Sequence, residues 1–345
     1  MTNALRRCLR SASEFFRLPR GAKGARRKDA RGLPPNDVGA DPALREAVGW
    51  LCRAQDQLAS RDGGVARHYS LLKGWSTSYP ETTGYIVPTM LACARALNQD
   101  DLRQRARRML DWLVSIQFPE GGFQAGPIGA GPKVPTIFNT GQILMGLAAG
   151  VREFGEPRYR EAMVRAADWL VNAQDPDGAW RRFPSPFTTA GDRTYDTHVA
   201  WGLLEAARIE PSESYADAAL ANVRWALRHQ RENGWFDKCC LTDPSQPLPH
   251  TLGYALRGVV EAYRFFKDNS LLEGARRTAD GLLGAIDREG FLPGRLDAGW
   301  QGTVSWSCLT GTVQTAICWL MLYEDTKEAR YRDAAFAANQ YVDGR

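Results

Sequence analysis

A recurring pattern of four residues constrains the fold more than any other feature of this sequence. A tryptophan is followed five residues later by a glutamine, and then by a glycine and an aromatic residue. The three clearest copies are Trp112, Gln117, Gly121 and Phe123; Trp169, Gln174, Gly178 and Trp180; and Trp225, Gln230, Gly234 and Phe236. Weaker copies begin at Trp50, Gly281 and Ala335, and the first five copies are 56 to 62 residues apart. A period of this size indicates an array of repeated supersecondary units.

Each repeat predicts two helices of different character. Helices that end in the pattern are expected at about 43–58, 101–117, 157–174, 213–230, 270–286 and 330–342. They mix charged residues with Ala and Leu, which is typical of helices with one solvent-exposed side. A second set, rich in apolar and small residues and therefore buried, is expected to begin at Thr83, Thr140, Thr197, Thr251 and Thr310. Each of these threonines is predicted to be an N-cap, because its hydroxyl can accept a hydrogen bond from a free backbone N–H.

The alternation of exposed and buried helices predicts an all-α fold, an α/α toroid in which a ring of inner helices is surrounded by outer helices. An open solenoid is the alternative, because stacked neighbours also bury a core. The sequence supplies six outer helices and five inner ones. The expectation is therefore either a truncated C-terminus or a gap that the N-terminal segment fills. We assign residues 43–345 to the toroid domain and residues 1–42 to a basic, disordered segment, in which Gly21 to Gly39 reads as linker.

The repeats resemble those of known toroid families. The Trp, Gln, Gly and aromatic pattern is similar to the QW-type repeat of the terpenoid cyclases and protein prenyltransferases. The helical alternation also resembles the six-hairpin glycosidases and the uronate-polysaccharide lyase or epimerase toroids. The segment Ser78 to Tyr85 (SYPETTGY) is similar to one in uncharacterised toroid proteins associated with bacterial polysaccharide biosynthesis. These resemblances imply the fold over residues 43–345, whereas one fold hosts many chemistries.

Charge indicates which partners the protein can be expected to bind, and cysteine content indicates its cellular compartment. Residues 1–40 hold ten Lys or Arg against three acidic residues, whereas the remainder of the chain carries a net charge of −2. The near-neutral body gives no reason to expect nucleic-acid binding, although the basic N-terminus suggests weak contact with a membrane surface. The seven cysteines are odd in number and form no CxxC pair. This usage is typical of reduced thiols and predicts a cytoplasmic protein.

Candidate site residues lie in the connections that lead into the inner helices. These connections are long, whereas those leaving the inner helices are short, so the long loops are expected at one end of the ring, where function is usually located. The catalytic candidates are Glu81, Asp196, His198, His250 and Tyr79. The substrate-binding candidates are Arg67, His68, Trp75, Arg182, Arg193, Tyr195, Trp300 and Trp306. Aromatic faces stack on sugars, Arg pairs with carboxylates, and Glu, Asp or His serves as acid or base.

These residues favour a carbohydrate-active enzyme, a hydrolase, lyase or epimerase that acts on an acidic oligo- or polysaccharide in bacterial polysaccharide metabolism. A toroid isoprenoid enzyme is one alternative, but the sequence lacks a DxDD run. A non-catalytic scaffold that binds a glycan or a protein is the other. No P-loop or GxGxxG sequence is present, and we expect no cofactor. We also expect no metal site, because Asp237, Cys239 and His250 match a zinc site only superficially.

Overall fold

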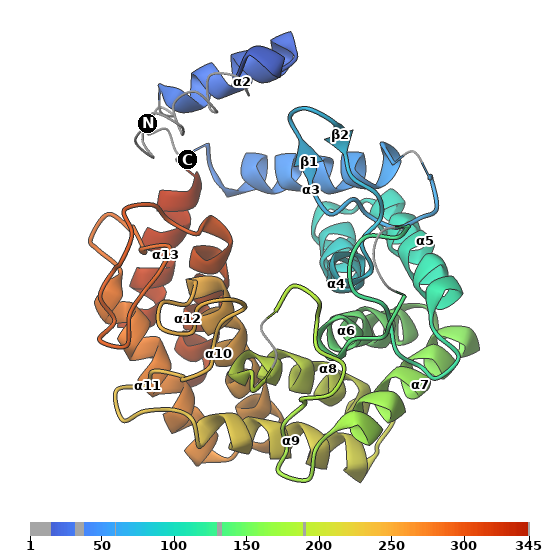
Figure 1. The fold of residues 1–345 in the computed structure, drawn as a ribbon, viewed down its shortest axis with the longest axis vertical. Coiled ribbons are helices and arrows are strands. Elements are labelled where there is room, and N and C mark those ends of the chain that lie inside the picture. The colour runs from blue at the N-terminus through green and yellow to red at the C-terminus, as the bar shows by residue number, and fades with distance from the viewer. Residues whose placement is uncertain (1–14, 32–37, 59, 130–132, 189–190, 344–345) are drawn as a thin grey trace, which may run out of the picture.

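The computed structural model describes residues 15–31, 38–58, 60–129, 133–188 and 191–343, and its core is a ring of paired helices (Figure 1). The outer helices are α3 (Ala40–Asp56), α5 (Asp100–Ile116), α7 (Pro157–Ala173), α9 (Glu213–Leu227), α11 (Asn269–Ala285) and α13 (Ala329–Asp343). The inner helices are α4 (Pro80–Leu97), α6 (Ile137–Phe154), α8 (Thr197–Ala207), α10 (Pro249–Phe266) and α12 (Leu309–Thr326). Smaller elements are α2 (Arg20–Ala30), β1 (Tyr69–Ser70), β2 (Gly74–Trp75) and the 3-10 turn η1 (Thr194–Asp196). The predicted all-α toroid is confirmed, whereas the short β1–β2 hairpin was not predicted.

Small residues bring neighbouring inner helices into close contact. A Cβ atom added at Gly84 of α4 would lie 2.5 Å from the Cα of Ile143 in α6. Similarly, a Cβ at Gly202 of α8 would lie 2.4 Å from the carbonyl oxygen of Gly141. Real Cβ contacts of that length do not occur, so these helices pack backbone against backbone and the apolar side chains around them are fully buried.

The glutamine of three repeats, Gln55, Gln117 or Gln174, joins its own turn to the next outer helix. The Gln174 side-chain amide donates to the carbonyl oxygen of Gly178 at 3.0 Å and to that of Ala218, in α9, at 2.8 Å. Gln117 makes the equivalent pair of bonds to Gly121 and Ala162. These carbonyl groups lie where the turn meets the next helix, so one side chain bonds the backbone of two successive repeats. The Asn222 side chain also donates to the Gly178 carbonyl. The glutamine recurs in the sequence pattern because its side chain forms the contact between successive repeats.

Replacing Gln174 with alanine is expected to lower the free energy of unfolding by about 2 kcal/mol, because two partly buried hydrogen bonds between successive repeats are lost. Urea unfolding followed by circular dichroism measures the change. Gln104→Ala is the matched control, because the Gln104 amide bonds only the exposed side chain of Asp100. Equal effects of the two substitutions would contradict the joining role of Gln174.

The threonine N-caps were predicted wrongly. The inner helices α4, α6 and α10 begin two or three residues earlier than expected, and none of the inner helices has a side-chain cap hydrogen bond. Thr83 and Thr140 lie within the first turn, where each hydroxyl donates to the carbonyl oxygen four residues before it. The same hydroxyls accept from the backbone N–H groups of Val65 and Phe123, in the preceding loops. The threonines therefore fasten the long loops to the inner helices.

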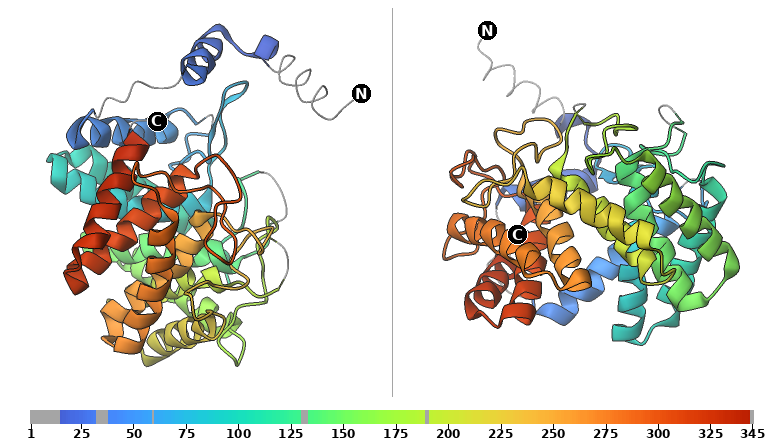
Figure 2. Two further views of the ribbon diagram at one scale, coloured as in Figure 1. Left: turned by 90° about the vertical axis from the view of Figure 1, so that its left-hand side faces the viewer. Right: turned by 90° about the horizontal axis from the view of Figure 1, so that it is seen from below.

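The two ends of the ring approach each other through outer helices. The start of α3 and the end of α13 face each other across a groove of about 530 Å³, lined by Ala40, Ala43, Phe336, Asn339, Gln340 and Asp343. In the described part of the chain no sixth inner helix lies between α12 and α4. Helix α2, which forms within the segment expected to be linker, lies outside the ring and does not fill that position (Figures 1 and 2). None of the helices among the described residues combines the length and apolar content that a membrane span requires.

The connections are sorted by length between the two ends of the ring. Figure 2 shows the long loops gathered at one end and the short helix-to-helix links at the other. Neighbouring loops are hydrogen-bonded, for example from the N–H of Ile128 to the carbonyl oxygen of Ser78 and from the N–H of Thr194 to that of Lys238. The expected asymmetry is thus present, and it places the first turns of the inner helices beneath one cluster of loops.

Candidate functional site

A cavity of about 270 Å³ opens beneath the clustered loops, over the first turns of α4, α6 and α10. It is smaller than the roughly 300–1,000 Å³ of pockets for drug-sized ligands, and suits a group of about one ring. Its lining combines aromatic side chains with a few ionisable and amide groups. The lining residues are Arg67, Tyr79, Glu81, Thr82, Tyr85, Phe138, Asn139, Ser185, Phe187, Thr188, Arg193, Tyr195, Leu241, His250 and Tyr254. Six of the predicted site residues, Arg67, Tyr79, Glu81, Arg193, Tyr195 and His250, therefore meet here.

Glu81 is the carboxylate of this cavity. It lies in the first turn of α4, and the Tyr79 hydroxyl donates a hydrogen bond of 3.0 Å to its Oε2 atom. Burial raises the pKa of Glu81 to about 7, although the Tyr79 hydrogen bond and the positive charge of Arg67 both lower it. A carboxyl group with this pKa can give or take a proton near neutral pH, which is the property required of a general acid or base.

Arg67 lies at the rim of the cavity. Its guanidinium group is 5.1 Å from the ring centroid of Tyr79 and 4.9 Å from that of Phe187. The side chain is exposed and has no ion pair with any described residue. A planar cation held between two rings, without an internal counter-ion, is suited to bind an acidic group of a ligand.

His250 provides a second proton-transfer group. It lies in the first turn of α10, with its ring centroid 4.5 Å from that of Tyr254. Its Nδ1 atom is buried and has no hydrogen-bond partner among the described residues. Burial lowers the pKa of His250, and a hydrogen bond with Gln314 opposes this only partly. The imidazole is therefore neutral near pH 7 and can accept a proton.

Arg193 and Asp196 form a buried ion pair beside the cavity. The Arg193 Nε atom is 3.1 Å from Asp196 Oδ2, and both side chains are less than 5% exposed. Arg193 also donates to the carbonyl oxygens of Gly191 and Trp180. Burial raises the pKa of Asp196 to about 6 against the influence of Arg193. Asp196 does not line the cavity, so its charge compensates Arg193 and does not face a ligand.

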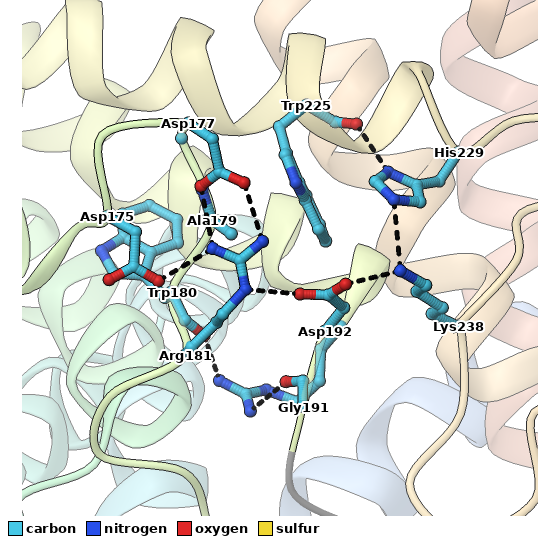
Figure 3. Close-up of polar contacts among 12 residues, drawn as sticks. Asp175, Asp177, Ala179, Trp180, Arg181, Gly191, Asp192, Trp225, His229 and Lys238 are labelled. Carbon is cyan, nitrogen blue, oxygen red and sulfur yellow. Dashed lines mark hydrogen bonds and ion pairs between the residues drawn. The ribbon is translucent and has the colours of Figure 1, made fainter.

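A network of ion pairs centres on Arg181 and Asp192, next to Arg193 in the sequence (Figure 3). Arg181 pairs with three carboxylates, those of Asp175, Asp177 and Asp192, at 2.7–3.0 Å. Lys238, from the next loop, pairs with the same Asp192. These contacts join two neighbouring loops, and none of the paired side chains lines the cavity, so we assign them a structural role.

His198 belongs to a second cavity. This cavity of about 170 Å³ is lined by Tyr85, Met145, His198, Trp201, Gly253, Tyr254, Arg257, Gln314 and Ile317. The Nδ1 atom of His198 lies 2.8 Å from Oε1 of Gln142, and burial holds the pKa of this histidine well below its usual value. Tyr85 and Tyr254 line both cavities. The structure therefore places His198 behind these two tyrosines and not beside Glu81.

The remaining candidates do not line either cavity. Trp75 packs against Trp50 and Tyr69, and His68 is exposed directly before β1. The exposed Arg182 donates to the carbonyl oxygen of Asn172. Trp300 is buried against Trp235 and donates to the Asn233 carbonyl, whereas Trp306 covers Gly294 with its indole ring half exposed. Contacts with neighbouring segments of the chain account for Trp75, Arg182 and Trp300.

Sequence reasoning did not single out Tyr85 and Tyr254 in the cavity lining. A signal was present, because each lies four residues after a predicted site residue, Glu81 or His250, and such residues share one face of a helix. Phe187 and Asn139 carried no comparable signal. In the described residues no group of three or more His, Cys, Asp or Glu side chains could hold a metal ion. Of the zinc-like set, Asp237 pairs with Arg231, and the Cys239 thiol donates to the Thr251 carbonyl.

Solved structures with a similar fold are enzymes of carbohydrate chemistry. An unsaturated glucuronyl hydrolase specific for heparin matches with a TM-score of 0.70 at 16% identity, covering 88% of this chain and 83% of its own. Cellobiose 2-epimerase from Bacillus thermoamylovorans matches with a TM-score of 0.69 at 12% identity, covering 87% and 86%. D-mannose isomerase matches with a TM-score of 0.70 at 12% identity, covering 89% and 87%. At these identities the matches establish the six-hairpin toroid fold. No curated protein sequence matches the chain.

The sequence also matches a protein-family model. Residues 80–260 match the squalene-hopene cyclase C-terminal domain, a stretch that covers slightly more than half of the chain. It runs from the start of α4 through most of α10, and so includes three clear copies of the Trp, Gln, Gly and aromatic pattern. This agrees with the resemblance of that pattern to the terpenoid cyclase repeat. The chain therefore belongs to the squalene-hopene cyclase C-terminal domain family.

Proposed function

We propose that this protein is a carbohydrate-active enzyme that acts on an acidic oligo- or polysaccharide in bacterial polysaccharide metabolism, in the cytoplasm. The observation that carries the proposal is the arrangement of Glu81 and Arg67. A carboxyl group with a pKa of about 7 lies in a ring-sized cavity, and an arginine without an internal counter-ion lies at its rim. The fold shared with sugar hydrolases, epimerases and isomerases supports this reading.

The lining favours proton transfer over direct displacement at the anomeric carbon. Glycosidases of the common type need two carboxyl groups about 5–9 Å apart. Glu81 is the only carboxylate among the described residues that line the cavity. Neutral His250 supplies a base and protonated Glu81 an acid, which together suit removal and return of a proton beside a carboxylate or carbonyl group. We therefore favour lyase or epimerase chemistry over two-carboxylate hydrolysis.

Arg67 has a defined part in such a reaction. Its guanidinium group would pair with the substrate carboxylate and stabilise the negative charge that develops when the neighbouring carbon loses its proton. The Tyr79 hydroxyl, hydrogen-bonded to Glu81, keeps that carboxyl group oriented into the cavity. Tyr85 and Tyr254 form the floor against which a sugar ring would stack.

A panel of acidic oligosaccharides tests the proposal. Purified protein is incubated with each sugar. Absorbance of unsaturated uronates detects a lyase, new reducing ends detect cleavage, and proton exchange with solvent D₂O detects an epimerase. A neutral oligosaccharide of the same length is the control. The proposal is rejected if none of the three assays detects a reaction with any sugar of the panel and calorimetry detects no binding. Binding without turnover would favour the alternative of a non-catalytic glycan-binding scaffold.

Replacing Arg67 with glutamine is expected to lower kcat/KM for an acidic substrate about tenfold to a hundredfold, because a charge-assisted contact is worth roughly 1.5–3 kcal/mol. Reaction of a neutral analogue should change little. Steady-state kinetics measure both. Arg182→Gln is the matched control, because Arg182 is an exposed loop arginine outside the cavity. Equal losses for the two substrates would contradict the assignment of Arg67 to the acidic group.

A further inference from the structure

The β1–β2 hairpin presents apolar side chains to solvent. Tyr69, Leu71 and Leu72 are each about 45% exposed at the strand and the turn. Beneath them, the rings of Trp50 and Trp75 lie 4.7 Å apart, and Trp50 is itself 46% exposed. Contact with water does not stabilise the two adjacent leucine side chains. A contiguous apolar patch at an exposed turn therefore indicates an interaction site.

The hairpin segment itself carries only positive charge. Residues 63–80, which include the whole hairpin, contain no Asp or Glu. They do contain Arg67 and Lys73, and both side chains are exposed. On α3 the guanidinium group of Arg53 lies over the ring of Trp50, 5.9 Å from its centroid. An apolar tip flanked by cations is complementary to a surface that is anionic outside and apolar inside.

The segment that contains helix α2 is also positively charged and also exposes an aromatic side chain. Residues 15–31 carry seven Lys or Arg and one acidic residue. Phe16 is 77% exposed, and the guanidinium groups of Arg26 and Arg27 lie 5.4 and 5.7 Å from the ring centroid of Phe15. Both Figures 1 and 2 place α2 and the hairpin at the α3 edge of the ring. Two separate segments thus offer aromatic or aliphatic side chains among cations at one edge.

We infer that this edge, formed by the β1–β2 hairpin and α2, binds the surface of an anionic lipid bilayer. Peripheral attachment requires apolar side chains that reach the acyl boundary and cations that meet the headgroups. Leu71 and Leu72 favour a bilayer over a sugar polymer, because aliphatic side chains do not provide the flat faces on which sugar rings stack. The inference does not depend on the proposed function. It places the cavity mouth, where Arg67 lies, close to the membrane.

Vesicle co-sedimentation of the full chain tests the inference. The probes are vesicles of phosphatidylcholine alone and of phosphatidylcholine with about one-third phosphatidylglycerol, each at low and high salt. We expect binding to the anionic vesicles that weakens with salt, and little binding to the neutral ones. The double variant Leu71→Ser with Leu72→Ser should bind at least about tenfold more weakly. Arg26→Glu with Arg27→Glu should have a similar effect.

A matched control variant and a folding measurement accompany this experiment. Val134→Ser removes an apolar side chain from another loop with the same 44% exposure as Leu71, and should bind like the unaltered protein. Thermal unfolding checks that every variant is folded. Failure to bind anionic vesicles, or undiminished binding by the leucine double variant, would overturn the inference. So would salt-sensitive binding to a soluble anionic polysaccharide that is equally strong and independent of the leucines, because the partner would then be a polymer.

Discussion

Replacing Glu81 with glutamine is expected to reduce turnover of an acidic oligosaccharide about 100- to 10,000-fold, the usual contribution of general acid–base catalysis. Glutamine has nearly the same shape, and its carbonyl oxygen can still accept the Tyr79 hydrogen bond, so the cavity should keep its form. Substrate binding should therefore change little while kcat falls. Steady-state kinetics on the substrate found in the panel separate the two quantities.

The same substitution has a predicted effect on stability that depends on pH. Glu81 has a pKa of about 7 in the folded chain against an ordinary value of 4.5. The stability that comes from its protonated form is therefore fully present below about pH 4.5 and is lost as the pH rises through 7. Glu81→Gln should thus be more stable than the unaltered protein at pH 8, by up to about 3 kcal/mol. Urea unfolding at pH 4.5 and pH 8 measures the difference.

An exposed glutamate provides the control for both measurements. Glu120 lies in the loop after α5, and Glu120→Gln should alter neither turnover nor the pH dependence of unfolding. Full turnover by Glu81→Gln, together with the expected change in stability, would mean that Glu81 is buried for structural reasons. In that case the proton-transfer role would pass to His250.

The fold could be predicted from the sequence because the residues that recur in the repeats are those that form the contacts between successive helix pairs. Gln174 and Gly178 recur in other repeats because the same pair of hydrogen bonds joins several repeats to the next one, for example at Gln117. The loop asymmetry was also readable, because the number of residues between helices is a property of the sequence. The N-cap prediction failed at Thr83 because a hydroxyl one turn inside a helix can bind a loop as well as a cap can bind a helix end.

The site could be predicted only in part. Loops lack the sequence periodicity that indicates, in a helix, which side chains are directed inward. Glu81 and His250 lie in the first turns of inner helices, and there the helix fixes their direction into the ring. Asp196 and His198 lie close together in sequence but face different surroundings, because the 3-10 turn ends between them. For Trp300 the choice between packing and substrate contact depends on Trp235 and Asn233, more than sixty residues earlier.

The glycine of each repeat should be the position least tolerant of substitution. Gly178 has a φ angle of +97°, and a Cβ atom added there would lie 2.5 Å from the carbonyl oxygen of Ala221 in α9. Alanine would therefore add backbone strain of about 1–3 kcal/mol, and the clash would also separate two outer helices. We expect Gly178→Ala to lower the free energy of unfolding by roughly 4 kcal/mol or more, as measured by urea unfolding.

Gly155 separates the two contributions. It ends α6 with a φ angle of +66°, but nothing lies within 4 Å of its added Cβ atom. Gly155→Ala carries the strain of a positive φ angle without the clash, and should cost only about 1–2 kcal/mol. If both variants lose the same stability, the repeat glycine is required only for its turn. If Gly178→Ala loses much more, the ring depends on each turn lying directly against the next outer helix, which is the contact that the repeat pattern encodes.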